Sequence, residues 1–494
     1  MKSQGDSKLV ILYHRTPFDE KITDGVREWV DQKSPNGIIP TLRNLFKNRP
    51  GGAWIAWREV NDIEKENDER IKMTNPTDFL LRRIPLTKEQ VNSFYHVTSK
   101  ESFWPILHTF PTHFDINNAN WDVFKEVNKR FAEAACHESA IEATVWVHDY
   151  NLWLVPLYIR KKRPDLKIAF FHHTPFPGND VFAILPWRNE IIESLLSCDL
   201  VGFHIPRYTE NFARAANCLV GASKNPKRNV DSKFIEIGSA LTEPKVTTSL
   251  FFNNRKIDLI TSPVGTSPSL IQRMIETDTI KNHRENIRIG TKKDRKLILS
   301  ASRVDYTKGN EELLLCFERL LERNNQIHGK IVLMLACVAA APGMKIYDET
   351  QRSIEEMAGR INGKFSKIDW VPIRFSTKRI PYEEMLAWFA EADICWITPL
   401  RDGLNLVAKE YAAARKDKDG VLVLSEFTGA SVILNGAVLT NPYSNKRMDE
   451  AIEEAINMSA KEQEERMRKM TAAVEAYTVD DWAKEQIESI NIES

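Results

Sequence analysis

The sequence has few cysteines and no metal-type spacing among them. Six cysteines occur in 494 residues, none of them in a CxxC pair, and most stand in apolar stretches such as residues 335–338. Isolated cysteines of this kind are typical of buried free thiols in a reducing compartment. Neither an HExxH motif nor a spaced Cys/His set occurs, so a zinc site is a poor interpretation. We expect no metal and no cofactor.

Long hydrophobic runs are also missing. The longest one, residues 331–341, is shorter than the roughly 18 residues that a membrane helix needs. The apolar run nearest the N-terminus, residues 9–13, is shorter than the core of a signal peptide, which has about 7 to 15 residues. We therefore expect a cytoplasmic protein that is not associated with a membrane.

An excess of either charge is the third thing the sequence lacks. Lys+Arg and Asp+Glu each number 68, so the formal net charge is zero. A dedicated nucleic-acid-binding protein normally carries a basic excess, so nucleic acid is not an expected partner. The best basic cluster, residues 161–163, fits the last turn of a helix, where cations complement the helix dipole.

What the sequence does contain is an alternation of short apolar runs and longer helical patterns. With 42% hydrophobic and 28% charged residues it is globular, and its length suggests two to four domains. The alternation predicts an α/β fold with parallel strands buried on both faces. We expect a domain change near Pro263, giving domains 1–262 and 263–494, the second ending in helices. The expected strands are 9–13, 144–147, 167–171, 200–203, 297–301, 330–335, 394–398 and 421–424.

Polar residues follow two of the expected strands in the first half. His148 and Asp149 follow strand 144–147, and His172 and His173 follow strand 167–171. Ligands of doubly wound sheets bind beyond the carboxyl ends of the strands, so these residues are candidates for a site. Each also has a purely structural interpretation, because Asp149 could cap the following helix and His173 could be a hydrogen-bonded core histidine.

Two segments of the second half suggest a site for a diphosphate. Arg303 and Lys308 come just after a strand and before a helix. In the other segment Gly403 permits close approach of the backbone, residues 404–407 present amides at a helix start, and Glu410 could accept hydrogen bonds from a ribose. Either segment alone could be surface charge, but together they indicate a nucleotide-diphosphate pocket. No GxxxxGK[ST] motif occurs, which disfavours P-loop hydrolysis.

Five segments, in the same order along the chain, resemble the trehalose-6-phosphate synthase family, which is glycosyltransferase family 20. They are residues 147–150 (VHDY), 170–177 (FFHHTPFP), 303–309 (RVDYTKG), 358–364 (AGRINGK) and 398–411 (TPLRDGLNLVAKEY). The resemblance extends from about Leu9 to the C-terminus. It implies the GT-B fold, with two Rossmann-like domains and the active site between them. It also implies transfer of glucose from a nucleotide sugar with retention of the anomeric configuration.

The resemblance implies roles for residues at matching positions. The catalytic set comprises Arg303, Lys308, His173 and Asp149. The donor set comprises Gly37, Asp402, Gly403, Asn405, Leu406, Val407 and Glu410, and the acceptor set comprises Arg15, Tyr95, Trp104 and Asp149. The resemblance implies that Gly37 lies over the diphosphate and that Glu410 contacts the ribose. It also implies that His173, from the catalytic set, contacts the glucosyl group.

One segment departs from the trehalose pattern. Trehalose-type synthases have an arginine that holds the phosphate of glucose 6-phosphate, whereas Ala341 stands at about that position here and no cation occurs between Val338 and Lys345. A charge-assisted hydrogen bond contributes about 1.5 to 3 kcal/mol, so this loss affects the choice of acceptor.

The whole chain looks more like the glucosylglycerol-phosphate synthases of salt-stressed bacteria, a branch of the same family. That resemblance implies ADP-glucose and sn-glycerol 3-phosphate as substrates, 2-O-(alpha-D-glucosyl)glycerol 3-phosphate and ADP as products, and a role in making a compatible solute. Two alternatives stay open. One is a trehalose-6-phosphate synthase that uses UDP-glucose and glucose 6-phosphate, and the other is a catalytically silent paralogue that binds sugar phosphates.

Overall fold

The computed structural model describes residues 5–24, 26–30, 38–47, 51–61, 67–74, 78–234, 239–291, 294–340, 344–415 and 419–490. The expectations for Gly37 and Ala341 lie outside these residues. The chain forms two compact units. Unit 1 comprises residues 1–230, 243–264 and 480–494, and unit 2 comprises residues 231–242 and 265–479. The domains expected from the sequence, 1–262 and 263–494, differ from these units in that the second includes residues 480–494, which belong to unit 1.

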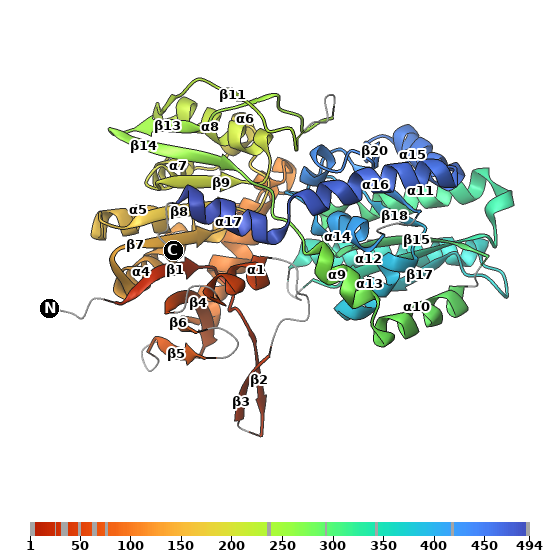
Figure 1. The fold of residues 1–494 in the computed structure, drawn as a ribbon, viewed down its shortest axis with the longest axis horizontal. Coiled ribbons are helices and arrows are strands. Elements are labelled where there is room, and N and C mark those ends of the chain that lie inside the picture. Colours follow the sequence, from red (N-terminus) through yellow and green to blue (C-terminus); the bar gives the residue numbers. More distant parts are fainter. Residues whose placement is uncertain are drawn as a thin grey trace. The chain divides into compact units, whose positions relative to one another are not determined.

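Unit 1 is built on a ten-stranded sheet (Figure 1). Seven strands, in the order β14-β9-β8-β7-β1-β4-β6, run parallel, and antiparallel strands close both edges. Their apolar runs are buried on both faces, as the pattern predicts. The strands are β1 (Ser7–Leu12), β4 (Gly52–Val60), β5 (Glu69–Met73), β6 (Phe79–Thr87), β7 (Ser139–His148), β8 (Lys167–His172), β9 (Leu200–Phe203), β10 (Ser223–Lys224), β13 (Ser249–Phe252) and β14 (Arg255–Thr261).

Helices and smaller elements complete unit 1. A long π-helix, η2 (Asn92–Phe103), continues into α3 (Trp104–Leu107). The hairpin β2 (Asp19–Thr23) and β3 (Val26–Val30) extends from the rest of the unit (Figure 1), and β11 (Arg228–Asn229) pairs with β12 (Lys245–Val246). The other helices are α1 (Ile38–Asn44), η1 (Leu45–Lys47), α2 (Lys88–Val91), η3 (Pro111–His113), α4 (Trp121–Glu138), η4 (Tyr150–Leu152), α5 (Val155–Lys162), α6 (Asn179–Phe182), α7 (Arg188–Leu195), α8 (Pro206–Val220) and α17 (Val479–Ser489).

The last helix, α17, returns to unit 1 after the chain has built unit 2. Its Trp482 is fully buried and stacks on Trp146 of β7, with ring centroids 5.4 Å apart. The edge of Phe171 in β8 packs against the same ring at 5.2 Å. Residues from the end of the chain therefore form part of the core of unit 1.

Unit 2 has a six-stranded sheet that is entirely parallel, in the order β17-β16-β15-β18-β19-β20. The strands are β15 (Lys296–Arg303), β16 (Ile331–Val338), β17 (Ile373–Ser376), β18 (Ile394–Ile397), β19 (Val421–Ser425) and β20 (Val438–Thr440). Numbered along the chain, this order is 3-2-1-4-5-6, the order of a Rossmann sheet. The parallel strands of unit 1 have the same arrangement, because the first of them, β1, lies between the second, β4, and the fourth, β7.

The helices of unit 2 pack on its sheet through apolar faces. Helix α11 shows the pattern, since Leu313, Leu314, Phe317, Leu320 and Leu321 recur at helical spacing and all lie in the core cluster with β15 and β16. The helices are α9 (Pro268–Ile275), α10 (Asp278–Thr291), η5 (Tyr306–Lys308), α11 (Asn310–Arg323), η6 (Asn325–Ile327), α12 (Lys345–Phe365), α13 (Tyr382–Glu391), α14 (Leu406–Ala414), η7 (Gly429–Val432), α15 (Asn445–Asn457) and α16 (Ala460–Ala476).

The strands and the helical C-terminal stretch expected from the sequence are confirmed, with shifts of a few residues at the ends. Strands β2 to β6, β10 to β14, β17 and β20 were not expected. The six cysteines are free, but the expectation that they are buried is wrong for Cys218, which lies on the exposed side of α8. Among the helices that the structure describes, none is long and apolar enough to cross a membrane.

Candidate functional site

The sheet order of unit 1 brings two sequence-distant strand ends together. Strands β1 and β7 are neighbours, with Leu12 beside Val147 in the register. The chain leaves β1 toward Arg15 and leaves β7 at Asp149. This is the point where the strand order reverses, and ligands of open α/β sheets bind at such points. Arg15 and Asp149, predicted from separate segments, therefore follow neighbouring strand ends.

Asp149 is a buried carboxylate in an uncommon backbone conformation. Its φ of 70° and ψ of 163° lie in a region that costs a residue with a side chain about 1 to 3 kcal/mol. Its Oδ1 atom accepts hydrogen bonds from the backbone N–H groups of Tyr150, at 3.0 Å, and His173, at 3.3 Å. The capping interpretation is thus correct for η4, and the same carboxylate also joins the segment after β8. Strain of this kind is typical of functional positions.

Burial raises the pKa of Asp149 to about 6. The two backbone hydrogen bonds oppose this shift, as do the positive charges of Lys100 and Arg15. A carboxylate with these properties can accept hydrogen bonds from the hydroxyl groups of a ligand at neutral pH.

The predicted acceptor residues Tyr95 and Trp104 come from the π-helix η2 and the start of α3. An Arg15 guanidinium N–H donates to the Tyr95 hydroxyl at 3.2 Å. In a π-helix each N–H bonds five residues back, as the N–H of Trp104 does to the carbonyl of Ser99. This wider winding brings Lys100 toward Tyr95, while the spacing of four residues already places Lys100 beside Trp104. The Lys100 ammonium lies 3.9 Å from the centroid of the Trp104 ring and 5.8 Å from that of Tyr95.

A group of histidines lies next to Asp149. His173 Nε2 and His148 Nδ1 are 3.1 Å apart, so one of them donates to the other. Burial lowers the pKa of His148 to about 3 and that of His173 well below its usual value, with the neighbouring histidines adding to the second shift. Both rings are therefore neutral at pH 7. The predicted core interpretation of His173 is correct in that the ring is hydrogen-bonded, but its partner is a second imidazole.

In unit 2 the point of strand-order reversal lies between β15 and β18. Arg303 ends β15, and Lys308 ends the short helix η5 that follows. The Lys308 ammonium lies 2.8 Å from Oδ2 of Asp402, which belongs to the segment after β18. Asn405 Nδ2 donates to the same oxygen at 3.2 Å. Three of the predicted donor-site residues are therefore joined directly.

Backbone contacts hold the segment after β18 in place. The Leu400 N–H donates to the carbonyl of Thr307 at 2.8 Å, and the Gly429 N–H donates to that of Asp402 at 3.2 Å. Gly429 lies so close to Gly403 that a Cβ atom there would be 2.2 Å from its carbonyl oxygen. The segment is therefore fixed between η5 and η7.

Helix α14 begins beside this ion pair. Asn405, with a φ of 77°, is its N-cap, and the side-chain oxygen accepts from the Ala408 N–H at 3.0 Å. The amides of Leu406 and Val407 are in the first turn, where an α-helix offers no carbonyl partner, and the residues are half-buried. Such amides suit an anionic group. The Lys308 ammonium, paired with Asp402, lies just before this helix start, and Arg303 precedes Lys308 in the chain. Glu410, one turn further on, is buried and accepts from the Tyr382 hydroxyl at 3.3 Å.

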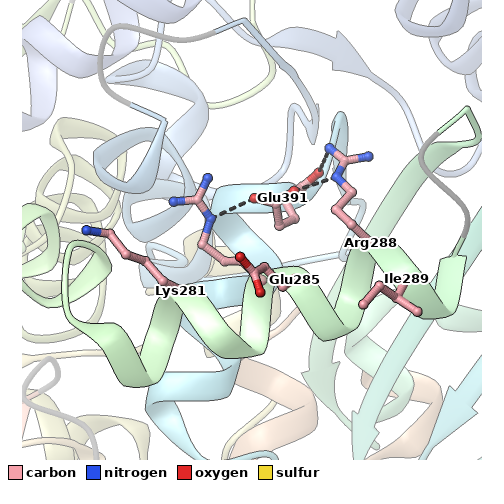
Figure 2. Close-up of a pocket in the computed structure, with 6 residues that line it drawn as sticks. Lys281, Glu285, Arg288, Ile289 and Glu391 are labelled. Carbon is pink, nitrogen blue, oxygen red and sulfur yellow. Dashed lines mark hydrogen bonds and ion pairs between the residues drawn. The ribbon is translucent and has the colours of Figure 1, made fainter.

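A separate pocket of about 430 Å³ lies between α10 and α13 of unit 2, lined by Lys281, Arg284, Glu285, Arg288, Ile289 and Glu391 (Figure 2). Its arginines are paired with Glu391, at 2.6 Å for Arg284, so the pocket belongs to the ion pairs that fasten α10 to α13. None of the predicted site residues lines it. Among the described residues there is also no group of three His, Cys, Asp or Glu side chains suited to a metal ion.

Comparison with known proteins adds a second line of observation. The family model described as "Glycosyltransferase family 20" matches residues 7–492. The chain belongs to glycosyltransferase family 20.

Relatives in this family differ in how similar they are to the chain. The "Glucosylglycerol-phosphate synthase" of Synechocystis sp. is 50% identical over 483 residues, covering 97% of this chain and 96% of the relative. The "Trehalose-6-phosphate synthase" of Mycolicibacterium gilvum is 37% identical over 484 residues, covering 98% and 93%. A crystal structure of an alpha,alpha-trehalose-phosphate synthase (UDP-forming) from Burkholderia xenovorans, in complex with glucose-6-phosphate, matches with a TM-score of 0.84 and 25% identity, covering 98% of this chain and all of the other.

Two predictions are confirmed by these matches. The protein is a glycosyltransferase, and its fold class is α/β of the GT-B type. Family membership also agrees with the Rossmann strand order in both units.

Sequence reasoning missed two residues that lie beside those predicted to bind the acceptor. Lys100 and the buried His14 lie beside the predicted residues, since the His14 ring is 5.5 Å from that of Tyr95. His14 could have been found, because it directly precedes Arg15 after a strand. For Lys100 the signal was its spacing of four residues from Trp104, which places both on one face of a helix, whereas α-helical spacing would turn residues 95 and 100 to different faces.

Proposed function

We propose that the enzyme is a retaining glucosyltransferase that moves glucose from ADP-glucose to sn-glycerol 3-phosphate. The products are 2-O-(alpha-D-glucosyl)glycerol 3-phosphate and ADP. The first of these serves the synthesis of a compatible solute. The observation that carries the proposal is the 50% identity with a glucosylglycerol-phosphate synthase, against 37% with a trehalose-6-phosphate synthase over the same length. We assign acceptor binding to the domain 1–262 and donor binding to the domain 263–494.

The acceptor end of the proposal rests on Arg15, Tyr95 and Asp149. Arg15 and the Tyr95 hydroxyl are already hydrogen-bonded and can together hold a phosphate, while the buried Asp149 carboxylate accepts from glycerol hydroxyls. Trp104 provides an apolar wall. Glycerol 3-phosphate is short, and its phosphate lies close to the attacking hydroxyl, so it does not need the distant arginine that is absent from residues 338–344.

The donor end of the proposal rests on unit 2. Lys308 and Arg303 bind the diphosphate with the amides of Asn405 to Val407. The family resemblance assigns Gly37 to the same diphosphate. Asp402 and the flanking Gly403 position the glucosyl group, and the family resemblance assigns His173 a contact with the same group. Glu410 accepts from the ribose hydroxyls.

The same residues account for transfer with retention. No carboxylate of the proposed site acts as a nucleophile. A phosphate oxygen of the departing ADP accepts the proton of the acceptor hydroxyl as that hydroxyl attacks on the face the ADP leaves. The charge that develops on the diphosphate is stabilised by Arg303, Lys308 and the helix amides, which are held in position before the reaction begins.

The experiment is a substrate matrix with the purified protein. ADP-glucose, UDP-glucose and GDP-glucose are each combined with glycerol 3-phosphate or glucose 6-phosphate, and release of the nucleoside diphosphate is followed. We expect the highest kcat/KM for ADP-glucose with glycerol 3-phosphate, about 10- to 200-fold above glucose 6-phosphate as acceptor. The anomeric configuration of the product, read by NMR, tests retention.

Other outcomes of the matrix support the alternatives. Equal or better kcat/KM with glucose 6-phosphate would return the enzyme to the trehalose branch. Absence of turnover with every pair, beside measurable binding of sugar phosphates, would support a silent paralogue.

A further inference from the structure

The described part of the acceptor end contains a cation that no prediction included. Lys100 projects from the π-helix between two aromatic residues, with its ammonium 3.9 Å from the centroid of the Trp104 ring and 5.8 Å from that of Tyr95. The residue is only half-buried. Three N–H donors on a compact charge give a lysine capacity for phosphate oxygens beyond its contact with a ring.

Lys100 and Arg15 stand around the same groups. Tyr95 contacts both, because its hydroxyl accepts from Arg15 at 3.2 Å and its ring lies near the Lys100 ammonium. Burial is the main cause of the lowered pKa of His14, and the positive charges of Arg15 and Lys100 lower it further. The same two charges favour the ionised form of Asp149. Lys100 and Arg15 therefore both lie near His14 and Asp149.

The charges of this region fit a phosphate monoester. Lys100 and Arg15 contribute two positive charges, Asp149 contributes one negative charge, and His14 is neutral. A phosphate monoester carries about 1.5 to 2 negative charges at pH 7, so it matches the two cations, while Asp149 takes the hydroxyl end of the same molecule.

We propose that Lys100 binds the phosphate of the acceptor together with Arg15, so that this phosphate is held without an arginine near Ala341. This inference rests on the proposed function, since it assigns a further residue to the proposed acceptor site. It places the phosphate-binding cations on the same unit as Asp149, which suits an acceptor whose phosphate and hydroxyls are only a few bonds apart.

The test compares Lys100→Met with the wild type. Methionine keeps the unbranched chain over Trp104 and removes the charge. We expect the KM for glycerol 3-phosphate to rise about 10- to 150-fold, with kcat and the KM for ADP-glucose changed less than about threefold. Inorganic phosphate, used as a competitor of the acceptor, should lose its inhibition in parallel. Lys100→Arg should restore most of the acceptor affinity.

Lys88→Met is the matched control, because Lys88 is exposed at the start of α2, just before the π-helix. It should leave every constant unchanged. An unchanged acceptor KM in Lys100→Met would overturn the inference. An equal loss of kcat/KM for both substrates would overturn it as well. If Lys100→Met does not fold, as judged by its melting curve, Lys100→Gln and Lys100→Arg decide the question by the same measurements.

Failure of the proposed function gives a different result. If the substrate matrix identifies glucose 6-phosphate as the acceptor, the proposed function is wrong. The Lys100 inference is then judged by the KM for glucose 6-phosphate, with the same expected rise and the same control.

Discussion

Asp149 combines two unfavourable properties at one residue, a positive φ and an ionisable group in a buried place. Its pKa of about 6 in the folded protein exceeds the value of about 3.9 in an unfolded chain. The folded state therefore binds more protons than the unfolded state between these pH values. The contribution of Asp149 to stability is largest below about pH 4 and falls as the pH rises to about 6, a loss of roughly 3 kcal/mol.

We predict that Asp149→Asn is more stable than the wild type at pH 8 and that this gain disappears toward pH 4. The amide keeps the Oδ1 acceptor for the N–H groups of Tyr150 and His173 but cannot ionise. The variant should bind glycerol 3-phosphate more weakly at pH 8, and the acceptor KM of the wild type should rise as the pH falls below about 6. Denaturant titrations and initial rates at each pH measure both effects. A stability difference that is independent of pH would contradict the shifted pKa.

Lys308 is the second residue whose surroundings predict a large effect. Its ammonium is largely buried and joined to Asp402, directly before the amides of α14. We predict that Lys308→Ala lowers kcat by about 100-fold or more, since removal of one preorganised donor costs about 2.7 to 4 kcal/mol. Lys330→Ala is the control, because Lys330 is exposed at the opposite end of the sheet, just before β16. A rate near that of the wild type in Lys308→Ala would remove Lys308 from the catalytic set.

At the scale of elements, the proposed donor site depends on how closely η5, α11 and the end of β18 approach one another. Gly309 joins η5 to α11 with a φ of 66°, and a Cβ atom there would be 2.1 Å from the carbonyl oxygen of Thr398. Both constraints require glycine. The turn that presents Lys308 is therefore specified by a backbone contact as well as by local sequence.

We predict that Gly309→Ala destabilises unit 2 by about 2 to 5 kcal/mol, the sum of left-handed strain and overpacking. It should also abolish binding of ADP, because η5 must shift away from Thr398. Gly329→Ala is the control, since Gly329 has a φ of 83° but nothing within 4 Å of its Cβ position. That variant should lose only about 1 to 2 kcal/mol and should keep ADP binding. Equal effects of the two substitutions would show that the contact with Thr398 is unimportant.

At the scale of the molecule, the chain passes between its two units four times, after residues 230, 242, 264 and 479. Unit 1 is therefore complete only when α17 is in place. Trp482 is the fully buried side chain that joins this helix to β7 and β8, and it also lies 6.5 Å from the ring of His173.

We predict that Trp482→Ala lowers the free energy of unfolding of unit 1 by about 3 to 5 kcal/mol, the usual cost of removing a buried tryptophan. Hydrogen exchange of residues 139–148 should become faster, while that of residues 296–303 in unit 2 stays nearly unchanged. Lys484→Ala on the exposed side of the same helix should change stability by less than about 0.5 kcal/mol. Unchanged exchange in β7 would contradict a structural role for α17 in unit 1.

The sequence by itself determined the α/β class, most of the parallel strands and most of the candidate residues. Strands buried on both faces leave uninterrupted apolar runs, and polar residues at their ends, such as Asp149 and Lys308, stand out from those runs. The family segments added residues 398–411 and the resemblance to glycosyltransferases. These signals are local, so no knowledge of packing was needed to read them.

Only the tertiary structure decided which strand ends are neighbours. The order of the sheets places the end of β1 beside that of β7, and the end of β15 beside that of β18, through pairings of residues far apart in the chain. It also decided that α17 packs in unit 1 and that Lys100 lies over Trp104. The approach of Lys100 to Tyr95, 5.8 Å from its ring centroid, depends on the winding of the π-helix, because α-helical spacing would turn residues five apart to different faces.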